Sequence, residues 1–81
     1  MPFTPDLTLY DADGFTVSWG KWDGNPQRCV GMRWGKWPHL QIGQPAYLII
    51  ADDLQRPWVA SLLGLPGANK QNILIALQEL P

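Results

Sequence analysis

With 81 residues the chain is long enough for one domain and too short for two, so residues 1–81 are expected to form a single domain. Hydrophobic residues make up 46% and charged residues 16% of the chain, which excludes the composition of a disordered protein. The net charge of −1 gives little repulsion between copies, and together with the small size it favours a homodimer.

The first half of the chain predicts two strands with the same pattern. A short β-favouring run at 7–10 leads into an acidic turn at 11–14. Large and small residues then alternate over 15–20, and they alternate again over 29–34 after a second turn. Paired antiparallel, these strands place Phe15 opposite Trp34, Val17 opposite Met32 and Trp19 opposite Val30, on one face. The other face becomes a floor of small residues: Thr16, Ser18, Gly20, Cys29 and Gly31, with Arg33 at one end.

The second half predicts a third strand and two helices. Residues 35–45 are predicted to form a loop, and the apolar run at 46–51 is predicted to form a short buried strand. A helix is expected from Pro57 to a stop at Gly64, and Asn69 is the expected N-cap of a second helix. The apolar stripe of that second helix consists of Ile73, Leu74, Leu77 and Leu80. The predicted fold class is α+β: a small antiparallel β-sheet of three to four strands, with two short C-terminal helices packed on one face.

One tetrapeptide occurs twice. Trp19-Gly20-Lys21-Trp22 recurs as Trp34-Gly35-Lys36-Trp37, so four of the five tryptophans lie in two identical segments. The alternation predicts that Trp19 and Trp34 are core residues and that Trp22 and Trp37 lie outside the apolar face. Tryptophan serves equally well in cores, stacking platforms and interfaces, because it joins a large apolar ring to a polar N–H.

The predicted ligand-binding residues are Trp22, Arg33, Lys36 and Trp37. These residues are expected to lie around the edge of the small-residue face. Three cations, Arg28, Arg33 and Lys36, occur between positions 24 and 51, and this segment contains no acidic residue. Aromatic rings among cations hold a cationic ligand through cation–π attraction or stack on the bases of single-stranded nucleic acid.

The sequence offers little support for a catalytic function or a metal site. His39 is the only histidine and Cys29 the only cysteine, and Arg28 points to the opposite face of the predicted strand from Cys29. Asp52 and Asp53 are expected to serve the amino-terminal dipole of a helix. The segment Asp11-Ala12-Asp13-Gly14 lacks the later ligands of an EF-hand, and residues 60–80 carry too few cations for a helix-turn-helix. No metal and no cofactor is predicted.

The cysteine count and the apolar runs bear on location. A single cysteine cannot form an intramolecular disulfide, and it excludes a four-cysteine zinc site. Residues 1–6 do not have the pattern of a secretory signal, and no apolar run approaches the roughly 20 residues that cross a bilayer. We expect a cytoplasmic protein without membrane contact.

Three segments together support a resemblance. Gly31-Met32-Arg33-Trp34 in a strand, an apolar strand ending in Asp52-Asp53-Leu54, and a short helical tail resemble the small uncharacterised proteins encoded by bacterial mobile elements such as integron cassettes. The resemblance implies no activity, but it favours an accessory binding protein over a housekeeping enzyme.

The sequence therefore predicts a non-catalytic binding module with a tryptophan-rich face for a protein partner or a small aromatic or cationic ligand. The alternative hypothesis is a single-stranded nucleic-acid-binding protein, and the third hypothesis is an enzyme that uses Cys29 or His39.

Overall fold

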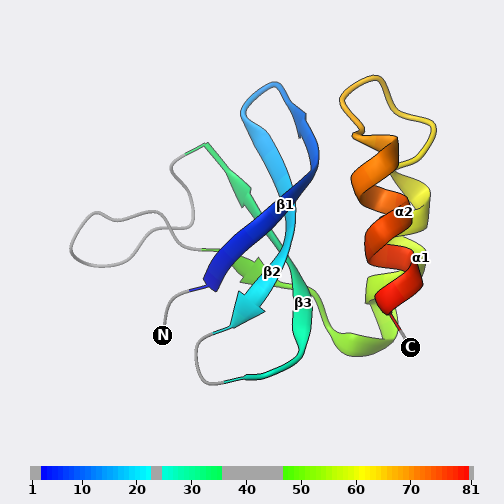
Figure 1. Ribbon diagram of the computed structural model, residues 1–81. Coiled ribbons are helices and arrows are strands. Elements are labelled where there is room, and N and C mark those ends of the chain that lie inside the picture. The colour runs from blue at the N-terminus through cyan, green and yellow to red at the C-terminus, as the bar shows by residue number, and fades with distance from the viewer. Residues whose placement is uncertain (1–2, 23–24, 36–46, 81) are drawn as a thin grey trace.

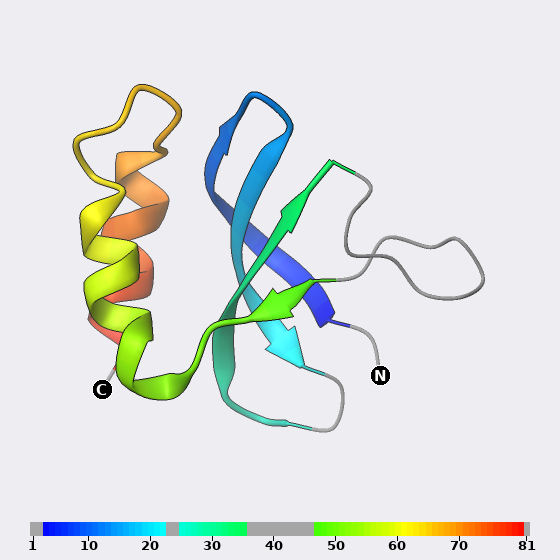
Figure 2. The same cartoon turned by 180° about the vertical axis from the view of Figure 1, so that it is seen from behind.

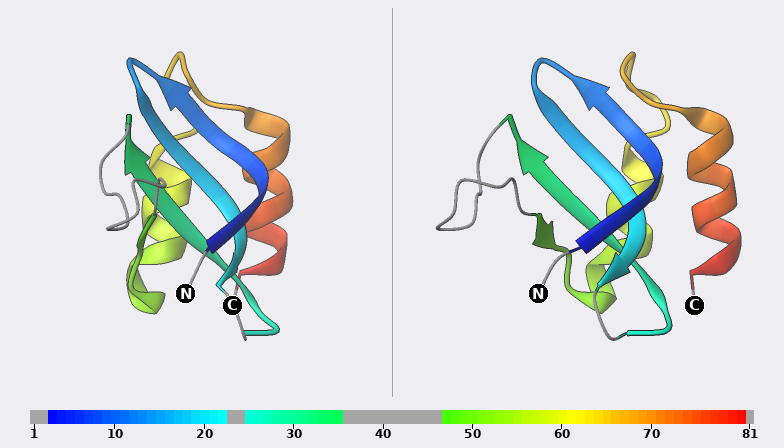
Figure 3. Two further views of the ribbon diagram at one scale, coloured as in Figure 1. Left: turned by 90° about the vertical axis from the view of Figure 1, so that its left-hand side faces the viewer. Right: turned by 60° about the vertical axis from the view of Figure 1, so that its left-hand side comes forward.

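Four strands and two helices make up the fold in the computed structural model, which describes residues 3–22, 25–35 and 47–80 (Figure 1). The elements are β1 (Phe3–Ala12), β2 (Phe15–Trp22), β3 (Arg28–Trp34), β4 (Leu48–Ile49), α1 (Asp52–Ser61) and α2 (Lys70–Glu79). The strands form one antiparallel sheet in the order β1-β2-β3-β4. The helices run in opposite directions, side by side, on one side of it (Figures 2 and 3). The predicted α+β class is confirmed.

The central pair of strands has the predicted register. Phe15 lies opposite Trp34, Val17 opposite Met32 and Trp19 opposite Val30. The turn between β1 and β2 is also as expected: Asp13 and Gly14 both have positive φ, at 54° and 81°. Two such residues between paired strands form a type I′ turn, whose twist matches that of the sheet.

β1 is bent around the sheet, which the sequence pattern did not predict. Its pairing with β2 is interrupted between Pro5 and Leu7 and again between Thr8 and Tyr10, and Leu9 at the second interruption is fully buried. Gly20 on β2 allows β1 to approach closely, because a Cβ atom there would lie 2.2 Å from the carbonyl oxygen of Thr4. The bulges therefore turn an edge strand inward over the sheet.

In the described part of the apolar run, residues 47–51, the strand is shorter and more exposed than predicted. Leu48 and Ile49 form the strand that pairs with β3, and they remain 41% and 38% exposed. The prediction of a buried strand is wrong, because β4 lies at the edge of the sheet, where exposure depends on what packs beside it.

α1 begins earlier than predicted. Its first residue is Asp52, and Pro57 lies inside the helix. Proline removes one hydrogen bond there but keeps a helical φ, so packing of the later residues maintains the helix through it. Asp52 and Asp53 occupy the first turn, at the positive end of the helix dipole, as predicted.

α2 is capped as expected, but its apolar stripe differs. The Asn69 side chain accepts a hydrogen bond from the backbone N–H of Asn72 at 3.0 Å. Ile73, Ala76 and Leu80 are buried, whereas Leu74 is 54% exposed. The prediction for Leu74 is wrong, because one side of α2 faces both β1 and α1 while Leu74 is turned about 100° from Ile73.

The main core lies between the sheet and the helices. Trp19 is its largest fully buried side chain. Around it pack residues from both layers: Leu9, Val17, Val30, Val59, Leu62, Ile73, Ala76 and Leu80. The helices thus cover the middle of the face that carries the large alternating residues.

Candidate functional site

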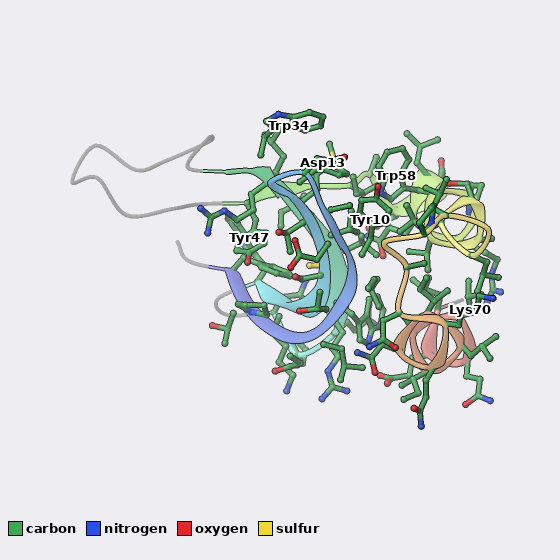
Figure 4. The ribbon with its side chains drawn as sticks, turned by 90° about the horizontal axis from the view of Figure 1, so that it is seen from above. Tyr10, Asp13, Trp34, Tyr47, Trp58 and Lys70 are labelled. Carbon is green, nitrogen blue, oxygen red and sulfur yellow. The ribbon has the colours of Figure 1, made fainter. Side chains whose placement is uncertain are left out.

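The first tryptophans of the two identical tetrapeptides have opposite surroundings. Trp19 is 2% exposed at the centre of the core, whereas Trp34 is 61% exposed at the end of β3. The prediction of a core position for Trp34 is wrong. Its ring contacts Phe15 across the strands, with 4.6 Å between ring centroids, but no helix covers its outer side, and it projects from the body beside the Asp13 turn (Figure 4).

The predicted floor of small residues is closed at its centre. The rings of Phe3 and Tyr47 pack against one another at 4.8 Å between centroids. A Cβ atom added at Gly31 would lie 3.1 Å from each of these two side chains, and Ser18 is only 1% exposed. An open binding floor is therefore a wrong prediction. The alternation within 15–34 gives no sign that residues 3 and 47 cover this face.

The structure separates two of the four predicted ligand-binding residues. Trp22 is half-buried opposite Phe3, at the end of β2, whereas Arg33 lies opposite Thr16 near the other end of that strand. Six residues of extended chain separate the backbones of these two positions by roughly 20 Å, so they lie toward opposite ends of the sheet. Lys36 and Trp37 lie outside the described residues, so the set of four as a single site stays a prediction.

Two cations near the repeat, Arg28 and Arg33, are engaged within the fold. Arg28 donates to Asp6 at 2.8 Å and to Glu79 at 3.0 Å, and these hydrogen bonds raise the pKa of its guanidinium. Arg33 donates to the Gly35 carbonyl, and its guanidinium carbon lies 5.8 Å from the centroid of the Tyr47 ring. Arg28 therefore ties β1 and α2 to β3.

Of the two candidate catalytic residues, only Cys29 lies within the described part of the chain. Cys29 is buried, and burial raises the pKa of its thiol, which disfavours the reactive thiolate. His39 lies outside the described residues. Within 3–22, 25–35 and 47–80 there is no group of three or more histidine, cysteine or acidic side chains that could hold a metal ion.

An apolar groove lies between the sheet and α1. It encloses about 470 Å³ and is lined by Met32, Ile50, Leu54, Pro57, Trp58 and Ser61, none of which is charged. Leu48 pairs with Met32 and lies at the edge of this groove. Trp34 is two residues after Met32 and is on the same face of β3. We call Met32, Trp34, Leu48, Ile50, Leu54 and Trp58 the Trp34 face. Trp34 and Trp58 are on the same side of the molecule in Figure 4.

The sequence pattern did not indicate this groove, because the predicted helix begins at Pro57. With α1 starting at Asp52, Leu54 and Trp58 are four residues apart and share one side of the helix. Leu54 is nevertheless 59% exposed, as it lies at the rim of the groove. The signal available in the sequence was a helical pattern that continues from Asp52 through Pro57, which would have indicated the longer helix.

A second cavity, also about 470 Å³, opens at the other end of the sheet, near the start of α1 and the end of α2. Its charged lining consists of Lys21, Arg28, Arg56, Asp52 and Glu79. Arg28 and Glu79 form an ion pair with one another, so part of this charge is already compensated within the fold.

Comparison of the chain with protein-family models, with characterised proteins and with solved structures finds no match. None of the helices in the described part of the chain is long and apolar enough to span a membrane.

Proposed function

We propose that this protein is a non-catalytic binding module whose Trp34 face docks an apolar surface of a protein. The observation that carries the proposal is the 61% exposure of Trp34 beside a groove without charged residues. Exposed apolar patches of this kind mark interaction sites, and tryptophan is prominent among the residues that dominate binding energy. A partner that covers the ring gains the free energy of removing it from water.

The predicted binding module is retained in this proposal, but its binding face is moved to the other side of the sheet. Phe3 and Tyr47 pack over the small-residue side of the sheet. The Trp34 face is on the opposite side, which also carries the helices, but Trp34 itself is not covered by them. We propose a cytoplasmic location, which the lone, buried Cys29 supports because free thiols persist in a reducing compartment.

Single-stranded nucleic acid remains the second candidate from the tryptophan repeat. The ion pairs of Arg28 weigh against it, since a cation held by two carboxylates has less attraction left for phosphate. The dependence of binding on salt concentration distinguishes the two candidates. Binding to an apolar face changes little between about 50 and 500 mM salt, whereas a phosphate-dominated complex weakens steeply.

The test uses Nile red, an uncharged dye that fluoresces in apolar surroundings. Leu54→Gln and Trp34→Ala are expected to reduce the dye signal at least about threefold, because both alter the Trp34 face. Leu74→Gln is the matched control, since Leu74 is an equally exposed helical leucine, at 54%, on the other helix. Equal loss in all three variants would refute the assignment of the face. Salt-sensitive binding of oligothymidine, with no effect of Leu54→Gln on the dye, would favour the nucleic-acid candidate.

A further inference from the structure

We infer that a second copy of this chain is the partner of the Trp34 face, with each copy placing Trp34 in the groove of the other. This inference rests on the proposed function and names the occupant of the same site. It follows from the shape and the charge of the face.

The face contains both a projection and a recess. Trp34 projects from the end of β3 (Figure 4). Met32, two residues before it on the same face of the strand, lines the groove together with Leu54 and Trp58. A surface that carries both parts can pair with itself about a two-fold axis, because each copy then supplies the projection for the other's recess. The resulting contact is closed, so it forms dimers and not chains.

Charge does not oppose this pairing. The lining of the groove has no charged side chain, so bringing two copies together buries no unpaired charge there. The net charge of −1 per chain also gives little long-range repulsion between identical molecules. A strongly acidic or basic partner has no complementary side chain in the groove itself.

The size of the face sets the strength of the dimer. A tryptophan ring buries roughly 150–250 Å² when fully covered, so the 61% of Trp34 that is exposed offers roughly 90–150 Å². A standard interface buries about 800 Å² on each partner, so Trp34 needs the whole groove and its rim to reach even the lower range. We therefore expect a weak dimer, with a dissociation constant of the order of micromolar.

Sedimentation velocity tests the inference on the whole chain between about 1 and 500 µM. The mass is expected to rise from the 9.1 kDa of one chain toward twice that value. Trp34→Ala and Leu54→Gln are each expected to weaken association at least about tenfold, whereas Leu74→Gln leaves it unchanged. Circular dichroism of each variant establishes that it is folded.

Mixing the two weakened variants tests the arrangement itself. In a two-fold dimer, the Leu54→Gln copy still has Trp34, and the Trp34→Ala copy still has an intact groove. The mixed dimer therefore regains one of the two contacts and is expected to associate more tightly than either variant alone. A mixture no tighter than the single variants would overturn the reciprocal placement of Trp34.

Failure of the dimer is distinguishable from failure of the binding face. A constant mass of 9.1 kDa at every concentration overturns the inference, and equal weakening by Leu74→Gln does the same. If the Nile red signal still depends on Leu54 in that case, the Trp34 face binds a different protein and the proposed function stands. A constant mass together with a dye signal indifferent to Leu54 refutes both.

Discussion

Replacing the first tryptophan of each tetrapeptide by alanine is expected to have very different effects on stability. Trp19→Ala empties a fully enclosed site and should cost about 3–5 kcal/mol. Trp34 is only about two fifths covered, which corresponds to roughly 60–100 Å² and an upper bound of about 1.5–2.5 kcal/mol. A domain of this length has roughly 4–12 kcal/mol in all, so Trp19→Ala alone removes a large fraction of its stability.

Trp19→Phe keeps this prediction testable if the alanine variant does not fold. The indole N–H of Trp19 is buried without a hydrogen-bond acceptor among the described residues, which costs about 1–3 kcal/mol. Phenylalanine removes that donor while keeping most of the ring, so we expect a net loss of only about 1 kcal/mol.

Urea unfolding followed by circular dichroism measures these differences without relying on the fluorescence of the residues that are changed. The experiment is done at about 1 µM protein, so that association does not contribute. Equal midpoints for Trp19→Ala and Trp34→Ala would refute the contrast between a core ring and a surface ring.

Three further predictions concern single positions. Gly20→Ala should destabilise the fold, because its Cβ meets the Thr4 backbone, whereas Gly64→Ala, with open space around it, should not; urea midpoints compare them. Asn69→Ala should cost about 1 kcal/mol in the same assay through loss of the helix cap. Burial raises the pKa of Cys29, so its thiol should react with Ellman's reagent more slowly than free cysteine at about pH 8. Because the unfolded thiol ionises first, stability should fall as pH rises above about 8.5, and Cys29→Ala should remove that part of the decline. Reaction of the native protein as fast as free cysteine would contradict the burial of Cys29.

Part of the candidate site could be anticipated from the sequence. The alternation placed Met32 and Trp34 on one face of a strand, and the register opposite Val17 and Phe15 is confirmed. The repeat also drew attention to Trp34. The exposure of Trp34 could not be anticipated, because it depends on where the helices end above the sheet.

The sequence by itself determined the local geometry. The period-two alternation determined β2 and β3, Asp13 and Gly14 determined the turn, and Asn69 determined the start of α2. Each of these depends on backbone preferences and on contacts within a few residues, or on the simple pairing of two adjacent strands.

Only the tertiary structure decided which faces are open. Trp19 and Trp34 are followed by the same three residues in sequence, yet Trp19 is enclosed by two helices and Trp34 lies beyond them. Phe3 and Tyr47, distant in the chain, close the small-residue face. Burial depends on which remote segments reach a side chain, and a local pattern reports only which side of the backbone that side chain occupies.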